Sequence, residues 1–406
     1  VKLKYNGNEN IHIEDDCGKK IDAEIIEGNL VFNTTLIPPY NFKTFYIKEG
    51  KIDKCCFAKK EEEWENEFYS IWIDKKSGLI RGIYDKKNNK EVIPRANSIP
   101  EDRSSFWAET CANLIKIYWE KPHPMSAWII GNIYKIENLI DIEKFEIKEK
   151  NSHIIFEVIR KYKDTEIIQR TLLYRDFPFI DFEFETDWKI KGNSEIGVPM
   201  VRANFNFNIQ KSEFFCEIPF GVMKRKNIPR EYPALRWAGF RENNYWYVII
   251  NREKYGYYID GNNLSLTLFR NPYEPDRNPD SGHHFISYRL FFGKSTITEV
   301  TKMAMEYNNQ PILFNGEIKK FDLFKIKGDI IPTSFKKSTG ENSYILRLVE
   351  YEGKKGKGAL IFERDVKNVW LSNVKEESLK KLIIKNKKLE FDFNPYQIIT
   401  FKVEFK

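Results

Sequence analysis

Several features that would mark other protein classes are missing from this sequence. It has only five cysteines in 406 residues; two are adjacent, and none has the C-x-x-C spacing of a zinc site. The first residues lack the apolar core of a signal peptide, and no apolar run approaches the roughly 20 residues that span a bilayer. We therefore expect a cytoplasmic protein with no disulfide framework and no membrane segment.

A strong charge of one sign is also missing. The net charge of +7 is the difference between 66 basic and 59 acidic residues, and the sequence has no basic block. A nucleic-acid-binding surface needs clustered lysine and arginine, so we expect no nucleic acid partner.

Aromatic residues are abundant, with 31 phenylalanines and 21 tyrosines. Such residues favour half-buried strands. Residues 179–185 (FIDFEFE) alternate apolar and acidic side chains, as in an antiparallel strand with one wet face. Residues 68–84 contain two apolar runs around Lys-Lys-Ser-Gly, which predicts a hairpin. Helices are expected only at 297–307 and, for two turns, at 376–385.

These patterns predict an all-β protein of packed antiparallel sheets. A polar stretch at 58–63 and the turn residues at 308–311 suggest two boundaries. We expect a small β unit at 1–60, a large antiparallel supersandwich at 61–307 and a C-terminal β-sandwich at 308–406.

An ordered series of motifs carries a family resemblance. Its members are residues 217–221 (EIPFG), 233–237 (PALRW), 251–256 (NREKYG), 270–272 (RNP) and 280–288 (DSGHHFISY). Their order and spacing resemble the C-terminal β-sandwich region of the family 38 glycoside hydrolases, the retaining α-mannosidases. Further similar motifs at 36–45, 64–69, 369–373 and 394–400 extend the resemblance over essentially the whole chain. It implies a galactose mutarotase-like supersandwich.

In this family the resemblance implies an aspartate nucleophile, a carboxylic general acid and a zinc ion bound by two histidines and two aspartates, all in an N-terminal α/β barrel. The nearest match here to the H-x-D zinc pair is His12-Ile-Glu14, with no companion histidine nearby. His283 and His284 are adjacent, so in a strand they point to opposite faces. We expect no catalytic residue, metal or cofactor in this chain, and zinc in its catalytic partner.

The resemblance also suggests a substrate contact. Residues 125–132 (MSAWIIGN) are similar to the family stretch D-A-W-x-I, which brings an aromatic residue to the rim of the sugar pocket. An aromatic face suits the apolar side of a pyranose. Trp128 is therefore the first candidate, with a core tryptophan as the alternative interpretation. Ser126 stands where the family usually has aspartate.

Five further residues are candidates for substrate binding, and each has a structural alternative. Lys254 and Tyr255 lie in the motif at 251–256, where the alternation of residues 255–258 also fits core packing, and Arg270 could hold a loop by bidentate pairing. Asp280 could form a turn with a positive-φ glycine at 282, and His284 could fix a loop by a hydrogen bond. Separately, we expect Glu217 and Arg236 to form a buried or semi-buried ion pair.

Three functions remain open. The first is the non-catalytic C-terminal half or subunit of a zinc-dependent retaining α-mannosidase, acting on mannose-containing carbohydrate with an N-terminal catalytic barrel. The second is a stand-alone carbohydrate-binding module. The third is an autonomous hydrolase that uses local acids such as Asp102, Glu109 and Glu120. We favour the first, and expect the lone chain to associate with itself through the apolar surface that a barrel would cover.

Overall fold

The computed structural model describes residues 2–406 except 27, 35–36, 38–39, 41, 51–56, 96–99, 102–104, 151, 277–278, 315, 317–322 and 340–341. The prolines at 38–39, the adjacent cysteines at 55–56 and Asp102 lie outside the described residues. The chain divides into two compact units. One comprises Val1–Lys54, Ile218–Val222 and Thr296–Lys406, and the other comprises Cys55–Glu217 and Met223–Ser295. The division into three domains at 60/61 and 307/308 stays a prediction.

The larger unit is built on two broad sheets. An 11-stranded sheet has the order β21-β24-β25-β18-β12-β10-β9-β8-β7, with β11 paired to β10 and β13 to β12. Its strands are β7 (Ala58–Lys60), β8 (Glu63–Glu65), β9 (Tyr69–Ile73), β10 (Ile80–Asp85), β11 (Lys90–Ile93), β12 (Ala112–Glu120), β13 (Ile133–Asn138), β18 (Val198–Asn206), β21 (Arg230–Pro233), β24 (Gly256–Asp260) and β25 (Asn263–Arg270).

A nine-stranded sheet has the order β14-β15-β16-β17-β26-β23-β22-β19-β20. Its strands are β14 (Lys144–Glu149), β15 (His153–Tyr162), β16 (Thr165–Tyr174), β17 (Phe179–Trp188), β19 (Glu213–Ile218), β20 (Gly221–Arg225), β22 (Trp237–Glu242), β23 (Tyr245–Asn251) and β26 (Gly282–Lys294). A short helix, α1 (Ser105–Ala108), precedes β12.

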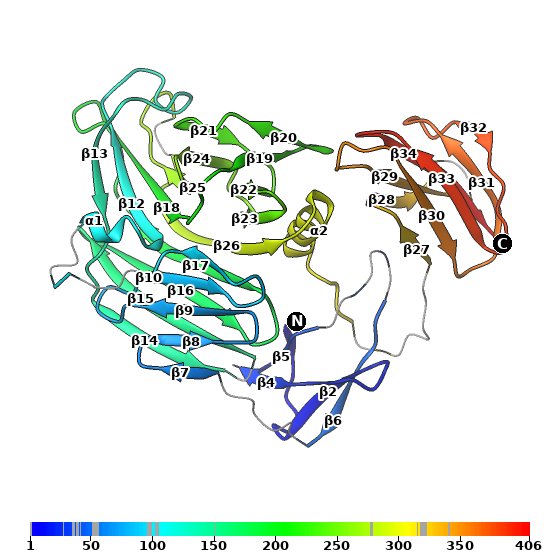
Figure 1. Cartoon of the computed structure of the whole chain (residues 1–406), viewed down its shortest axis with the longest axis horizontal. Coiled ribbons are helices and arrows are strands. Elements are labelled where there is room, and N and C mark those ends of the chain that lie inside the picture. The colour runs from blue at the N-terminus through cyan, green and yellow to red at the C-terminus, as the bar shows by residue number, and fades with distance from the viewer. Residues whose placement is uncertain are drawn as a thin grey trace. The chain divides into compact units, whose positions relative to one another are not determined.

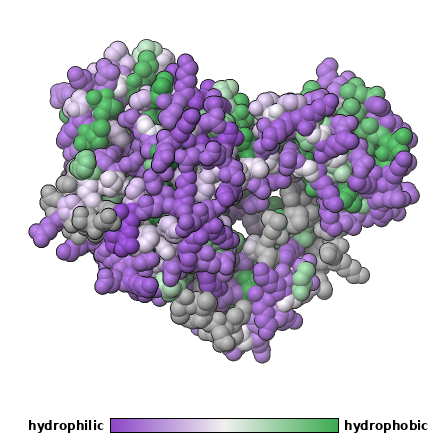
Figure 2. Space-filling view, in the orientation of Figure 1, coloured by the Kyte–Doolittle hydropathy of each residue, from purple (hydrophilic) through white to green (hydrophobic). Residues whose placement is uncertain are grey.

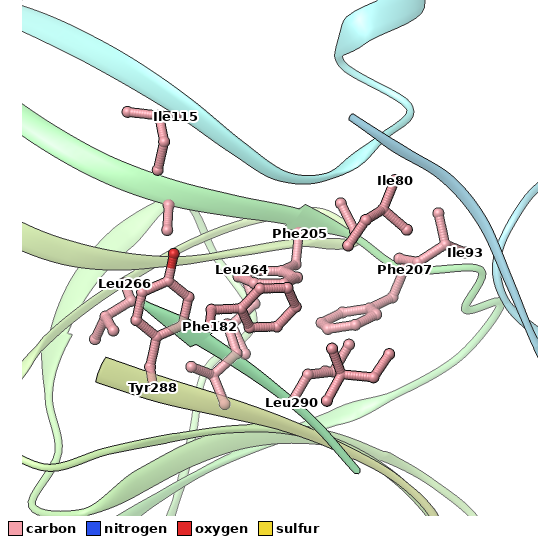
Figure 3. Packing of buried hydrophobic residues seen from close by; sticks show 14 of the residues in the cluster. Ile80, Ile93, Ile115, Phe182, Phe205, Phe207, Leu264, Leu266, Tyr288 and Leu290 are labelled. Atoms are coloured by element: carbon pink, nitrogen blue, oxygen red, sulfur yellow. The ribbon is translucent and has the colours of Figure 1, made fainter. Parts of the chain in front are cut away.

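The core lies between these two sheets (Figure 3). Phe182 on β17 lies 5.4 Å, between ring centroids, from Phe205 on β18 and also from Tyr288 on β26. Ile180, Phe182 and Phe184 are fully buried, which confirms the face predicted from their period-two spacing. The predicted hairpin is also confirmed, because β9 and β10 pair antiparallel.

The smaller unit contains four further sheets, with the orders β1-β5-β4, β3-β2-β6, β27-β30-β33 and β28-β29-β34-β31-β32. Its strands are β1 (Lys2–Lys4), β2 (Ile11–Asp15), β3 (Lys20–Ile21), β4 (Ala23–Ile26), β5 (Asn29–Phe32), β6 (Phe45–Glu49), β27 (Phe324–Lys327), β28 (Ile331–Lys337), β29 (Tyr344–Val349), β30 (Gly356–Phe362), β31 (Val366–Ser372), β32 (Ser378–Lys381), β33 (Lys388–Phe393) and β34 (Ile398–Phe405). Separate apolar clusters underlie the N-terminal and the C-terminal strands.

The two helix predictions have different outcomes. The helix expected at 297–307 is α2 (Ile297–Asn308), which begins with a capping box between Thr296 and Glu299. The helix expected at 376–385 is wrong, because β32 occupies part of that segment and pairs with β31. Pairing to a neighbouring strand supplies backbone hydrogen bonds, and here it overrides local helix propensity.

The all-β prediction and the large antiparallel supersandwich are confirmed. Strands account for nearly all regular structure in the described residues, and each described strand pairing is antiparallel (Figure 1). Of the helices in the described parts of the chain, none has the length and hydrophobicity that a bilayer crossing requires.

The predicted pair of Glu217 and Arg236 is confirmed as well. The Glu217 side chain is fully buried, and Arg236 donates to both of its oxygens through Nε, at 3.1 and 3.0 Å, and also through Nη2. The backbone N–H of Arg236 donates to the same carboxylate at 3.0 Å. Burial raises the pKa of Glu217, while Arg236 acts in the opposite direction. The pair ties the end of β19 to the segment before β22.

We predict that His153 makes the free energy of unfolding depend on pH. Burial, reinforced by the positive charge of Lys150 and opposed by Asp181, lowers the pKa of His153 to about 4. Between the ordinary histidine pKa and about 4, the unfolded chain binds a proton that the folded chain does not, so stability falls as pH falls through this window.

Replacing His153 by phenylalanine removes this term and keeps a ring beside Tyr174. Urea unfolding at pH 7 and pH 4.5 should show a pH-dependent loss that is smaller in His153→Phe by about 2 kcal/mol. An equal loss in both proteins would contradict the assignment.

Candidate functional site

Strand register brings the ends of four strands to one end of the 11-stranded sheet. Glu120, the last residue of β12, lies opposite Val198, the first residue of β18. Arg270, the last residue of β25, lies opposite Met200 near the same end of β18. Since β24 runs antiparallel to β25, its first residue, Gly256, is also at this end. Figure 1 shows these strands side by side, with the loops that join them gathered beyond β12 and β13.

This end of the sheet collects the sequence-predicted residues. Trp128 lies in the loop between β12 and β13, which we call the Trp128 loop (residues 121–132). Lys254 and Tyr255 directly precede β24. His284, near the start of β26, stacks on Phe269 of β25 with ring centroids 4.5 Å apart, so the segment that follows Asp280 reaches the same end.

A buried carboxylate ties the Trp128 loop to the sheet. Glu120 is fully buried and accepts two parallel hydrogen bonds from Arg270, from Nε at 2.7 Å and from Nη2 at 2.8 Å. It also accepts the backbone N–H of Gly131 at 2.6 Å, and Nε2 of His123 lies 3.1 Å away. The loop thus begins and ends on one carboxylate. The bidentate role considered for Arg270 is confirmed, with Glu120 as the partner.

Arg270 also holds the middle of the loop. Its Nη2 donates to the carbonyl oxygens of Ser126 at 2.9 Å and Ile129 at 3.0 Å, on the two sides of Trp128. These bonds and the pair with Glu120 use only Nε and Nη2 of the guanidinium.

Ser126 connects the loop to the segment after Arg270. Its hydroxyl accepts the backbone N–H groups of Tyr273 and Glu274, both at 3.1 Å, and donates to the Glu274 carbonyl at 3.2 Å. The N–H of Ala127 donates to the same carbonyl at 2.7 Å. Ser126 therefore satisfies backbone groups of the neighbouring segment, a role that the sequence alone does not reveal.

The Trp128 side chain itself faces outward, with 69% of its surface exposed, so the core interpretation is wrong. Other large apolar side chains of the same hairpin are also exposed. We call this group the hairpin patch: Met125, Trp128, Ile129, Ile130, Ile133, Tyr134 and Ile136. Figure 2 shows apolar atoms gathered over the region labelled β13 in Figure 1. Apolar patches of this kind commonly mark binding surfaces.

The other candidates divide between exposed and structural positions. Tyr255 is 55% exposed, so the core-packing alternative is wrong for this residue; Tyr257, two residues on, is buried. Lys254 is half-buried and donates its backbone N–H to Asn251. His284 lies 2.9 Å from the Asp280 carbonyl oxygen, which confirms the loop-fixing bond, and Gly282 has the expected positive φ of 109°. Substrate contact by these residues stays a prediction.

Of the acids considered for an autonomous hydrolase, the two that the structure describes, Glu109 and Glu120, do not form a pair. Glu109 precedes the nine-residue strand β12, and Glu120 ends it. The Glu109 carboxylate contacts Lys116, which precedes Glu120 by four residues, or about 13 Å along the strand. Retaining glycosidases need two carboxyl groups about 5 Å apart. Glu109 instead contacts Lys116 and Asn138.

Among the described residues, the histidine and acid positions do not bring together the two histidines and two aspartates of the zinc set that the resemblance implies. Nε2 of His12 lies 3.3 Å from Glu14, and its Nδ1 lies 2.7 Å from the Gly50 carbonyl oxygen. Within the described residues, the one group of three possible ligands is Asp15, Asp16 and Cys17, which contains no histidine. Asp15 already accepts hydrogen bonds from Lys43 and from backbone N–H groups of its turn.

Taken together, two facing antiparallel sheets with an exposed aromatic loop at one end define a large β-sandwich region. The family model described as the glycosyl hydrolases family 38 C-terminal domain matches residues 64–278, more than half of the chain. The family 38 C-terminal beta sandwich domain matches residues 329–401. The chain therefore belongs to glycoside hydrolase family 38 and corresponds to its C-terminal region.

Individual relatives agree with this assignment. Alpha-mannosidase G of Dictyostelium discoideum is 23% identical over 95% of this chain and 38% of its own length. Human alpha-mannosidase 2C1 is 23% identical over 58% of this chain and 24% of its own length. A crystal structure of a family 38 protein from Enterococcus faecalis has a TM-score of 0.74 at 13% identity, covering 98% of this chain and 53% of that one. The chain spans about half or less of the length of these relatives.

We predict that Trp128 contributes little to stability. Trp128→Ala should change the free energy of unfolding by no more than about 0.5 kcal/mol, because an exposed ring loses few contacts. The matched control is Trp64→Ala, since Trp64 is fully buried in the core of the same unit, 4.7 Å from the Phe156 ring. That variant should lose about 3–5 kcal/mol. Comparable losses in urea unfolding would contradict the exposed position of Trp128.

Proposed function

We propose that this chain is the non-catalytic C-terminal half or subunit of a zinc-dependent retaining α-mannosidase. It acts with an N-terminal α/β barrel that carries the nucleophile, the general acid and the zinc ion. Two observations support the proposal. The curated relatives named above are alpha-mannosidases, and this chain matches only part of each. In addition, the donor groups of the described residues do not fit the zinc set.

The observation that carries the proposal is the exposed Trp128 ring on a loop fastened at several points. A ring whose backbone is already fixed loses little conformational entropy when a sugar stacks on it. Arg270 lies directly beneath this loop and is positively charged, and its unused Nη1 group is a donor for a sugar hydroxyl. We assign Trp128 and Arg270 to one wall of the mannoside pocket, with Lys254, Tyr255, Asp280 and His284 as further contacts.

The hairpin patch supplies the docking surface in this proposal. Its large apolar side chains are exposed next to one another. Such a patch is suited to burial against a second protein surface. The barrel covers part of the patch and leaves Trp128 at the rim of the sugar pocket. Without the barrel, the patch promotes self-association of the lone chain.

The proposal predicts activity only in combination with a barrel. The chain is assayed with an aryl α-mannoside, first alone and then together with the barrel-bearing polypeptide or upstream segment encoded in the same genome. We expect no turnover by the chain alone and turnover by the combination, which a zinc chelator abolishes. The chelator should leave the melting temperature of the chain alone unchanged.

Trp128→Ala in the active combination should lower kcat/KM by at least about tenfold, which corresponds to 1.4 kcal/mol of lost binding to the transition state. Chelator-resistant turnover by the chain alone would refute the division of labour. Binding of mannosides by the chain alone, with no effect of any barrel, would instead favour the carbohydrate-binding module, to which an exposed aromatic ring is equally suited.

A further inference from the structure

We propose that Glu120 is a positioning residue of the sugar site: it fixes where Trp128 and Arg270 stand without touching substrate itself. This inference rests on the proposed function. The Glu120 side chain has no exposed surface, so it cannot reach a ligand directly. Its influence passes through the groups that donate to it.

The donors to Glu120 come from two separate parts of the chain. Arg270 supplies two hydrogen bonds, the Gly131 backbone supplies one, and the His123 ring lies within hydrogen-bonding distance. Gly131 and His123 belong to opposite arms of the Trp128 loop, and Arg270 belongs to β25. One carboxylate therefore joins both arms of the loop to a strand 150 residues away in sequence.

Close steric contacts also restrain the Trp128 loop near Glu120. A side chain at Gly131 would meet the His123 ring at 2.4 Å, so the two arms of the loop are in close contact. A side chain at Gly197 would lie 1.8 Å from the Glu120 carbonyl oxygen, so the 193–197 turn presses against the base of the loop. The loop has little freedom to adjust once the carboxylate is in place.

Glu120 also determines the orientation of the Arg270 guanidinium group. Because Glu120 engages Nε and Nη2, the guanidinium plane of Arg270 is fixed, and Nη2 also reaches the carbonyls before and after Trp128. Removing the negative charge leaves a half-buried guanidinium without its counter-charge, which weakens the Arg270 contacts that hold the tryptophan. The expected consequence is a mobile Trp128 and a misdirected Arg270.

The test compares Glu120→Gln with Glu217→Gln. Glu217 is an equally buried carboxylate with a multidentate arginine partner, and it holds a different part of the same sheet system. Hydrogen–deuterium exchange of the chain alone reports the Ala127 and Gly131 amides. We expect Glu120→Gln to accelerate exchange in residues 121–132 by at least tenfold while core strands stay protected, and Glu217→Gln to leave this loop unchanged.

The second readout uses the combination of chain and barrel. Glu120→Gln should raise KM for the aryl α-mannoside by about tenfold with kcat changed less than threefold, because the lost contacts hold substrate and transition state alike. Glu120→Asp, which keeps the charge, should recover part of the loss. Should Glu120→Gln fail to fold, Arg270→Lys gives the same loop exchange readout, since lysine cannot form the bidentate pair.

Unchanged loop exchange in Glu120→Gln, or equal acceleration in both glutamine variants, would overturn the positioning role. The exchange measurement needs no barrel, so it decides this role even if the combination proves inactive. If the combination is inactive but Glu120→Gln still accelerates exchange in residues 121–132 alone, the proposed function is contradicted and the positioning role of Glu120 is not.

Discussion

The pair of Glu120 and Arg270 is the interaction on which the candidate site depends. Burying a charge costs several kcal/mol, and an ion pair offsets that cost only with good geometry and further hydrogen bonds. Both conditions are met: the two bonds are parallel and short, and the backbone of Gly131 supplies a third. Displacing the loop is costly in such a site, because it removes the Gly131 donor from a buried carboxylate.

The fold explains why this charge lies where it does. Along β12, Ile115, Ile117 and Trp119 face the core between the sheets, so the alternate residues face the other side. Glu120 is the last of those alternate residues. Arg270 reaches it from β25 across β18, which lies between the two strands and begins in register with both. Sheet order thus turns a distant sequence pair into a contact.

Other ion pairs in the larger unit have similar geometry but a different structural role. Glu217 with Arg236 and Asp181 with Arg289 have similar bidentate geometry. Asp181 on β17 and Arg289 on β26 lie opposite each other on neighbouring strands. Their ion pair therefore reinforces strand pairing that the backbone already makes. Glu120 and Arg270 instead hold a loop that has no ladder of its own, and this loop carries an exposed tryptophan.

The sequence predicted the fold class, the period-two strands and the family, because alternation and ordered motifs are local signals. It also named Trp128 and Arg270, through the resemblance. It did not predict that Ser126 organises the segment at 273–274, or that Glu120 is the partner of Arg270, since both depend on which strands become neighbours. The error at 376–385 has the same origin. Part of this segment forms β32 because it pairs with β31, and the residues of the segment alone do not reveal that pairing.

The arrangement of the candidate residues also bears on the proposed division of labour. Trp128, Arg270 and His284 approach one end of the sandwich from loops and strand ends, and two of them are fixed by contacts within this chain. A surface fixed in this way is suited to orienting a ligand. Hydrolysis with retention needs in addition two carboxylates facing each other, whereas Glu120, the carboxylate that holds this loop, is paired with Arg270 and shielded from solvent. The proposed function therefore assigns the reactive acids to a second surface, that of the barrel.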